Sequence, residues 1–393
     1  MSRDSGVVNC ECTKVISVES ALAGLNAILV YDVDGNDYYD LTAGMMCMVL
    51  GHSHPELTET MREQAELLVH ESSWYSNPWA IEFAELITST LPGNLKVVNF
   101  AVTGSEANEI AMRMAVATTR KHDIVSVLRG LHGGSLAAES VTSVGGGRKG
   151  GLGPFMIPAR SNAILAPFCY RCPVNLTYPS CDIGCLKLSE DMMEHMTSKS
   201  VAGIIAESIL VPGGMIVPPE EWLPRLKQVA KDWGSLLILD EVATGFGRSG
   251  MMFACEAEGV APDLMCLAKG LTGGYLPMAA TLTTERVFEA FLGPPAEGRT
   301  FFHGHTYSGN ALAAAAALAT LDIFEQDQIL EALPAFLGAA DETIAAPQRG
   351  APSRCKFVPE VVLGQHRQHP ANKRLVAAER RDSPGLSFAL SGR

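Results

Sequence analysis

The sequence lacks any apolar run long enough to cross a membrane. Its longest run, residues 311–319 (ALAAAAALA), is about half of the ~20 residues that a transmembrane helix requires, and most of it is alanine. The N-terminal residues MSRDSGVVNCECTKV also lack the apolar core of a secretory signal and the acid-poor, arginine-rich pattern of a transit peptide. We therefore expect a cytoplasmic protein that does not insert into a membrane.

Positive charge and cysteine are both scarce. The chain has 30 Lys and Arg against 43 Asp and Glu, which gives a formal net charge of −13. This balance disfavours nucleic acid or an anionic membrane surface as the main partner. The 10 cysteines in 393 residues are too few for a disulfide-dense secreted domain, so we expect free thiols. Small molecules and further copies of the chain remain as partners.

The residues that are present indicate a globular α/β protein. A composition of 47% hydrophobic and 19% charged residues excludes a disordered, collagen-like or coiled-coil chain. Strand-like runs alternate with helix-period segments, which predicts a largely parallel sheet covered by helices. A short hairpin is expected over 27–41, and helices are expected over 55–70 and 77–91. The strand-like runs are 97–101, 124–128, 201–207, 235–241, 262–269 and 277–284.

Composition also suggests how the chain is divided. Residues 145–154 form a glycine-rich segment that we interpret as a loop or lid, and from about Ala339 the sequence loses periodicity and becomes basic and proline-rich. The expected parts are an N-terminal segment of a small domain (1–60), a large α/β domain (61–310), a connecting helix (311–338) and an atypical C-terminal tail (339–393).

Two strand-like runs end in residues that carry chemistry. Asp240 follows an apolar run and would need a cationic partner there, while Lys269 follows another and would have a lowered pKa as a buried amine. Pyridoxal phosphate requires a lysine for its Schiff base and a carboxylate for its pyridinium nitrogen. Gly104 and Ser105 lie between a strand and a helix, where backbone N–H groups can bind the phosphate.

Four ordered motifs resemble the class III pyridoxal-phosphate-dependent aminotransferases, over roughly residues 20–335. They are TGSEANEIAMRMA (103–115), LILDEVATGFGRSGMMFACE (237–256), PDLMCLAKGLTGGYLPMAA (262–280) and FFHGHTYSGNALAAAAALATLDIFE (301–325). The resemblance implies a fold-type I enzyme of mostly parallel sheet that acts as a homodimer. It also implies an aminotransferase activity that moves an amino group from a small amine or amino acid to a keto acceptor.

The resemblance also implies a role for each matching residue. Lys269 would bond to the cofactor, Asp240 would pair with its ring nitrogen, and Glu207 would be an acid that gates the substrate pocket. The cofactor-binding set would be Gly104, Ser105, His132, Asp240, Val242, Lys269 and Thr306, with Val242 against the ring and Thr306 reaching the phosphate in the neighbouring subunit.

Some positions depart from the family's pattern. Leu131 stands before His132 where the family has an aromatic residue that stacks on the ring, and no arginine after Ala339 can be assigned to the substrate carboxylate. The later motifs are most similar to the adenosylmethionine-using branch, and the earlier ones to the 2,2-dialkylglycine decarboxylase branch. A decarboxylating transaminase and a cofactor-binding homologue of impaired activity therefore stay open as alternatives.

Three other patterns have simpler interpretations. GFGRSG (245–250) matches a dinucleotide-binding fingerprint, but five residues separate it from its strand, which argues against an oxidoreductase. Cysteines at 169, 172, 181 and 185 have spacings that a zinc or iron–sulfur site can use, although we favour metal-free thiols. Two His-x-His pairs, at 52 and 54 and at 303 and 305, lie in turns where we expect hydrogen bonds to backbone rather than a metal.

Overall fold

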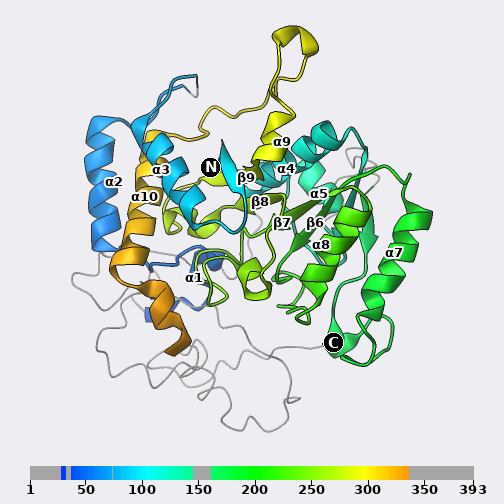
Figure 1. The fold of residues 1–393 in the computed structure, drawn as a ribbon. Coiled ribbons are helices and arrows are strands. Elements are labelled where there is room, and N and C mark those ends of the chain that lie inside the picture. The colour runs from blue at the N-terminus through cyan, green and yellow to red at the C-terminus, as the bar shows by residue number, and fades with distance from the viewer. Residues whose placement is uncertain (1–27, 32–36, 73, 145–160, 336–393) are drawn as a thin grey trace, which may run out of the picture.

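The fold is a seven-stranded sheet with helices on both faces (Figure 1). The computed structural model of the chain describes residues 28–31, 37–72, 74–144 and 161–335. In the sheet the strands lie in the order β3-β9-β8-β7-β6-β4-β5. Their bounds are Leu95–Ala101 (β3), Asp123–Val127 (β4), Ser161–Ile164 (β5), Val201–Glu207 (β6), Leu236–Asp240 (β7), Leu264–Leu267 (β8) and Ala279–Thr284 (β9).

The predicted N-terminal hairpin and helices are confirmed. Strands β1 (Leu29–Tyr31) and β2 (Asp37–Tyr39) pair antiparallel. Helices α2 (Pro55–Leu67) and α3 (Pro78–Thr90) both begin with proline, which needs no N–H at that position. The remaining helices are α1 (Ala43–Met46), α4 (Gly104–Thr119), α5 (Leu136–Val141), α7 (Gly184–Met196), α8 (Trp222–Asp232), α9 (Glu285–Glu289) and α10 (Ala311–Gln326), with short 3-10 turns η2 (Cys169–Arg171), η3 (Ala254–Glu258), η4 (Lys269–Thr272) and η5 (Pro295–Glu297).

The central strands are apolar throughout because helices cover both of their faces. In β7, Leu237 and Leu239 belong to one core cluster with α3, α8 and α10, whereas Leu236 and Ile238 belong to the other cluster with α4 and α9. Alternate residues of a strand point to opposite faces. Such a doubly covered sheet reads in the sequence as continuous apolar runs.

The predicted, largely parallel sheet is confirmed, and β9 is the one antiparallel strand of the sheet that the structure describes. Strands β4 to β8 run parallel to one another, but β9 is antiparallel to both β3 and β8. The segment between β8 and β9 contains only the short turn η4 and no crossover helix, so the chain returns in the opposite direction. The carboxyl end of β9 therefore lies at the opposite edge of the sheet from those of β4 to β8.

Strand β5 was not predicted, and other expectations lie outside the described residues. Four residues at 161–164 are too short a run to stand out, and they pair with β4 at the edge of the sheet. The glycine-rich segment 145–154 and the tail from 339 are not among the residues that the structure describes. Within the described ranges, no helix is both long and apolar enough to span a bilayer.

Candidate active site

Three ionisable side chains meet at the carboxyl edge of the parallel strands. Glu207 ends β6, Asp240 ends β7, and the two are register partners in the sheet. Asp240 also pairs with Cys266 of β8, which lies three residues before Lys269. Parallel strands end at the same edge of a sheet, so the two acids and the lysine converge as the sequence predicted.

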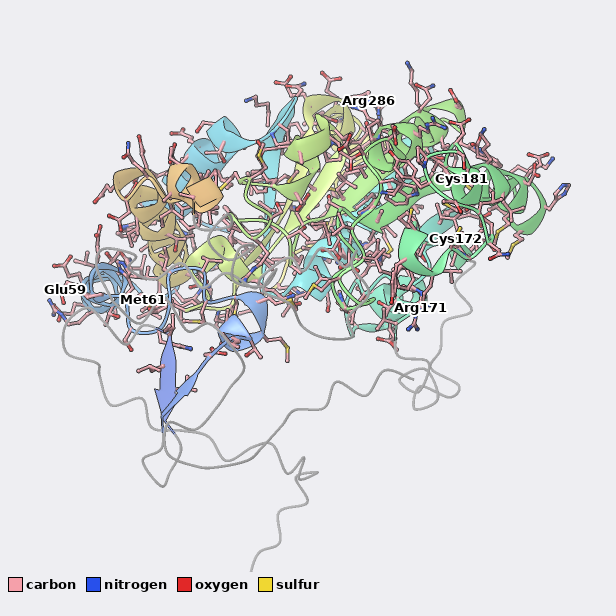
Figure 2. The ribbon with its side chains drawn as sticks, turned by 90° about the horizontal axis from the view of Figure 1, so that it is seen from below. Glu59, Met61, Arg171, Cys172, Cys181 and Arg286 are labelled. Carbon is pink, nitrogen blue, oxygen red and sulfur yellow. The ribbon has the colours of Figure 1, made fainter. Side chains whose placement is uncertain are left out.

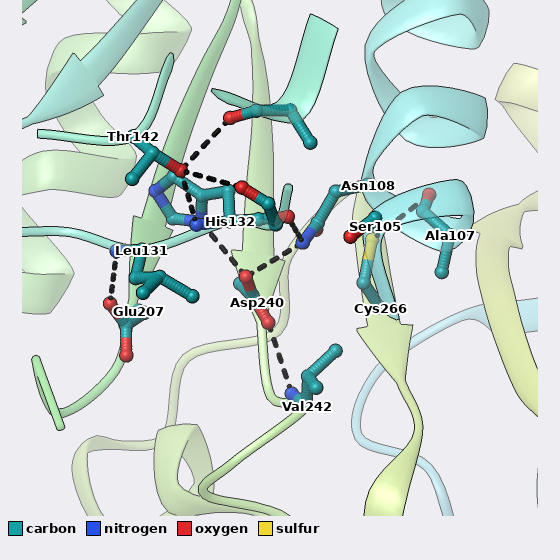
Figure 3. A network of polar contacts seen from close by, with 12 residues as sticks. Ser105, Ala107, Asn108, Leu131, His132, Thr142, Glu207, Asp240, Val242 and Cys266 are labelled. Atoms are coloured by element: carbon teal, nitrogen blue, oxygen red, sulfur yellow. Dashed lines mark hydrogen bonds and ion pairs between the residues drawn. The ribbon is translucent and has the colours of Figure 1, made fainter. Parts of the chain in front are cut away.

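Asp240 is buried and is held by an amide, an imidazole and a backbone N–H. The Asn108 amide Nδ2 and the His132 ring Nδ1 each lie 2.8 Å from its Oδ2, and the Val242 N–H donates to its Oδ1 at 3.1 Å (Figure 3). The side chain of His132 is fully buried, and the backbone N–H of this residue donates to the Thr142 hydroxyl at 2.9 Å. The predicted cationic partner of Asp240 is therefore an imidazole, which is cationic only when protonated.

Asn108 is a functional residue that the sequence reasoning missed. Its Nδ2 donates to the backbone carbonyl of His132 as well as to Asp240, each at 2.8 Å, and the residue is 1% exposed. It lies on the buried face of α4, within the motif that begins at Thr103. A polar residue on an apolar helix face was the available signal, because a buried amide requires partners.

Glu207 lies in the same network, on the other side of Leu131. Its carboxylate accepts hydrogen bonds from the backbone N–H of Leu131 at 2.8 Å and of Val211 at 3.2 Å. Burial, and then the charge of Asp240, raise the pKa of Glu207 from 4.5 to about 7. The acid therefore exchanges a proton near neutral pH.

Lys269 is a partly buried amine in a strained backbone position. Desolvation lowers its pKa, while the charges of Asp240 and Glu207 oppose that change. Its φ of 49° lies in the left-handed region that residues other than glycine rarely adopt. Among the described residues, no hydrogen bond or ion pair engages its side chain. A lysine with these properties is available as a nucleophile.

The N-terminus of α4 forms an anion cradle beside Asp240. Thr103 and Glu106 form a capping box, in which the Thr103 hydroxyl accepts from the Glu106 N–H at 3.2 Å. Gly104 and Ser105 occupy the first helical positions, whose amides have no partner within a helix. A Cβ at Gly104 would lie 2.9 Å from Val242 Cγ1, so only glycine leaves this approach open.

Thr306 lies in a different cavity, of about 1110 Å³, whose lining contains none of the other predicted site residues. Trp74, Tyr75 and Phe302 line the same cavity and are 91%, 72% and 85% exposed. Trp74 and Tyr75 are therefore exposed side chains of this surface.

Three of the four paired histidines have side-chain partners, so the expected backbone hydrogen bonds are wrong for the rings of His52, His303 and His305. His52 Nε2 lies 2.8 Å from an Asp40 carboxylate oxygen, and His303 contacts Arg113. His305 Nδ1 lies 3.6 Å from a carboxylate oxygen of Glu106.

The segment GFGRSG has the wrong structure for a dinucleotide fingerprint. It forms a series of turns after β7, in which the Phe246 N–H donates to the Met252 carbonyl at 2.7 Å. The next element is the 3-10 turn η3, and no α-helix opens at the glycines. The required strand–turn–helix context is therefore absent from this part of the described chain.

The four clustered cysteines are free and line one very small cavity. Figure 2 shows Cys172 and Cys181 at the end of the molecule opposite to Glu59 of α2. Burial raises the pKa of Cys169, and that of Cys185 to about 11, so both are thiols at neutral pH. Across the described ranges, no three Cys, His, Asp or Glu side chains are placed to hold one metal ion.

Comparisons with known proteins agree on one family. A family model described as Aminotransferase class-III matches residues 21–343. A protein of Nitratidesulfovibrio vulgaris named adenosylmethionine-8-amino-7-oxononanoate aminotransferase is 40% identical over 315 residues, which are 77% of this chain and 57% of that protein. The chain thus spans little more than half the length of that relative.

Solved structures of other aminotransferases have the same fold as this chain. The adenosylmethionine-8-amino-7-oxononanoate aminotransferase of Methanocaldococcus jannaschii superimposes with a TM-score of 0.73 at 33% identity, covering 81% of this chain and 72% of that one. The taurine:2-oxoglutarate aminotransferase of Bifidobacterium kashiwanohense, solved in complex with PLP and glutamate, has a TM-score of 0.72 at 28% identity over 81% of this chain and 72% of that one. The relatives share a fold but are named for different substrates.

Proposed function

Because the chain belongs to the class III aminotransferases, we propose that it uses pyridoxal phosphate to move an amino group from a small amine or amino acid to a keto acceptor. One observation carries the proposal. The amine of Lys269 is buried beside the carboxylate of Asp240, at the common edge of two parallel strands. A buried lysine and a buried acid on neighbouring strand ends are the two groups that this cofactor requires.

The residues of the site fit the cofactor. Asp240 Oδ2 accepts from two side chains, whereas Oδ1 accepts only the Val242 N–H among the described residues, so Oδ1 can accept one more hydrogen bond. The absence of a Cβ at Gly104 lets Val242 pack closely against the N-terminus of α4, because a Cβ would lie 2.9 Å from Val242 Cγ1. Ser105 and the N-terminus of α4 provide donors for a phosphate.

Asp240 would hold a proton on the ring nitrogen of the bound group. Its burial and its bonds to Asn108 and His132 keep the carboxylate in one orientation, without the reorganisation that water would require. The bound cofactor would supply an electron sink for negative charge that develops at the substrate carbon.

Lys269 would act as nucleophile and then as proton carrier. Because burial lowers its pKa, a larger fraction of the amine is neutral near pH 8 than in water. With the cofactor and substrate bound, the Lys269 amine would carry a proton to or from the substrate carbon. Glu207, with a pKa of about 7, would gate the neighbouring pocket by gaining or losing its own proton.

The exposed cavity at Thr306 supports a homodimer. Trp74 and Phe302 expose large aromatic surfaces there, and such patches on a folded protein mark contact sites. We propose that Thr306 of each copy contributes to the phosphate site of the other. The seven described cysteines are free, which supports work in a reducing compartment, the cytoplasm.

The division of the chain is also a proposal. The seven-stranded sheet, Leu95 to Thr284, supports a large cofactor domain over 61–310, and α10 supports a connecting helix from 311. Residues 1–60 would contribute to a small domain together with chain beyond 338.

Half-reactions followed by absorbance test the function. Purified protein with pyridoxal phosphate should show a band at roughly 410–430 nm that changes with a reactive amine from a panel of donors. Lys269→Ala should abolish the band, and Lys199→Ala, which removes an exposed lysine paired with Glu194, should retain it. A wild-type protein without the band would refute the assignment of Lys269.

The same assay separates the alternatives. Release of CO₂ from 2-aminoisobutyrate would identify a decarboxylating transaminase. A band that no amine changes would identify a cofactor-binding homologue of impaired activity.

A further inference from the structure

A second buried acid, Glu241, lies directly after Asp240 and touches none of the groups assigned to the cofactor. It is 0% exposed. Its Oε1 accepts from the Ser208 hydroxyl at 2.6 Å and from the Cys255 N–H at 2.9 Å. Its Oε2 accepts from the Ala254 N–H at 3.1 Å and from the Thr244 hydroxyl.

Four donors match the roughly four lone-pair positions of an ionised carboxylate. Burying such a group without partners is costly, so each donor matters. Hydrogen bonds to an ionised acceptor are also stronger than neutral ones. The Glu241 side chain therefore connects three segments of the chain, namely the end of β6 at Ser208, the turn at Thr244 and the start of η3 at residues 254–255.

One of the four bonds crosses between strands at the active site. Ser208 follows Glu207 at the end of β6, and Glu241 follows Asp240 at the end of β7. Glu207 and Asp240 are the last register pair of the β6–β7 ladder. The hydroxyl-to-carboxylate bond continues the connection between the two strands one residue past the point where the ladder ends.

We propose that Ser208 and Glu241 form a clasp that positions Glu207 against Asp240 and keeps water away from Lys269. Its importance for catalysis rests on the proposed function. The clasp touches no reacting atom, so both residues are positioning residues. Without it, the end of β6 is free to separate from β7, and Glu207 and Lys269 become more hydrated.

The groups that face Lys269 determine the direction of the effect. Asp240 and Glu207 raise its pKa from the strand ends, the half-buried thiol of Cys47 acts in the same direction, and Arg248 opposes them. Burial is the largest cause and lowers the pKa. Hydration of the site therefore raises the pKa of Lys269 towards its ordinary value.

Hydration of the site also changes the pKa of Glu207, and this change favours a protonated Lys269 as well. It faces Asp240 and His132, and burial is the largest cause of its raised pKa. Hydration lowers that pKa, so more of the acid is ionised at neutral pH, and this further favours a protonated Lys269.

Competitive acetylation of the cofactor-free full chain measures this effect directly. Lys269 is labelled with acetic anhydride between pH 6 and 10, and its peptide is quantified by mass spectrometry. We expect Ser208→Ala to raise the midpoint of labelling by roughly half a pH unit or more. Ser208→Thr keeps the hydroxyl, so its labelling midpoint should match that of the wild type. Ser208→Cys has a weaker donor, so its midpoint should lie between those of the wild type and Ser208→Ala. The cysteine variant replaces the alanine variant in the test if the latter does not fold.

Thr244→Val is the matched control. Thr244 is also buried and donates a hydroxyl to the same carboxylate, but it lies on the Glu241 side and reaches no residue of β6. Its loss should lower the melting temperature about as much as the loss of the Ser208 hydroxyl while leaving the Lys269 midpoint in place. Equal shifts in both variants, or no shift in Ser208→Ala and Ser208→Cys, would overturn the proposal.

The readout needs no cofactor, so it is independent of the proposed function. If the chain binds no pyridoxal phosphate but shows the expected labelling series, the clasp is supported and the proposed function is refuted. If the chain binds the cofactor through Lys269 but the variants show no labelling difference, the proposed function is supported and the clasp is refuted.

Discussion

Replacing Glu207 with glutamine should make the protein relatively more stable as the pH rises. Glutamine has nearly the same shape and is neutral at every pH, as protonated Glu207 is. In the wild type, folding raises the pKa of Glu207 from 4.5 to about 7, so the folded state binds more protons than the unfolded state between these values. The contribution of this acid to stability is therefore complete below pH 4.5 and is lost as the pH rises through 7.

The size of the effect follows from the same two values. A change from 4.5 to about 7 corresponds to about 3 kcal/mol, of which about 2 kcal/mol is lost between pH 5.5 and 8.5. The Glu207→Gln variant does not have this loss. Its free energy of unfolding, minus that of the wild type, should therefore rise by about 2 kcal/mol over that interval.

Urea unfolding of the cofactor-free protein at several pH values is the assay. Other titrating groups act on both proteins and cancel in the difference. Glu63→Gln, on the exposed side of α2, is the control and should give a difference that is flat with pH. A flat difference for Glu207→Gln would refute the reasoning, because it would mean that Glu207 has the same pKa in the folded and unfolded chain.

Three further predictions concern the cradle, the network and the surface. Gly104→Ala should weaken binding of pyridoxal phosphate in absorbance titrations, because its Cβ would lie 2.9 Å from Val242 Cγ1, and Val242→Ala should restore part of the affinity. Asn108→Leu should lower the free energy of unfolding in urea by about 1–3 kcal/mol, since it leaves buried acceptors without a donor; an unchanged value would contradict the network. Trp74→Glu combined with Phe302→Glu should yield a monomer in sedimentation, and an unaltered dimer would place the interface elsewhere.

The fold class was predictable from the amino-acid sequence, and so was the proximity of Asp240 and Lys269, whereas Glu207 was proposed only from the family resemblance. Continuous apolar runs that alternate with helix-period segments specify strands buried on both faces, and such strands run mostly parallel. Their carboxyl ends meet at one edge, so residues that directly follow the runs, such as Asp240 and Lys269, could be brought together without coordinates. The phosphate cradle at Gly104 followed from the same logic.

Only the tertiary structure decided which groups surround those residues. Asn108 and Asp240 are 132 positions apart, and nothing local to either reveals that α4 presents one to the other. The antiparallel direction of β9 depends on a connection that contains no crossover helix. Partners of this kind arise from the order of strands in the sheet, which differs from their order in the chain, and periodicity reports only which face of an element is buried.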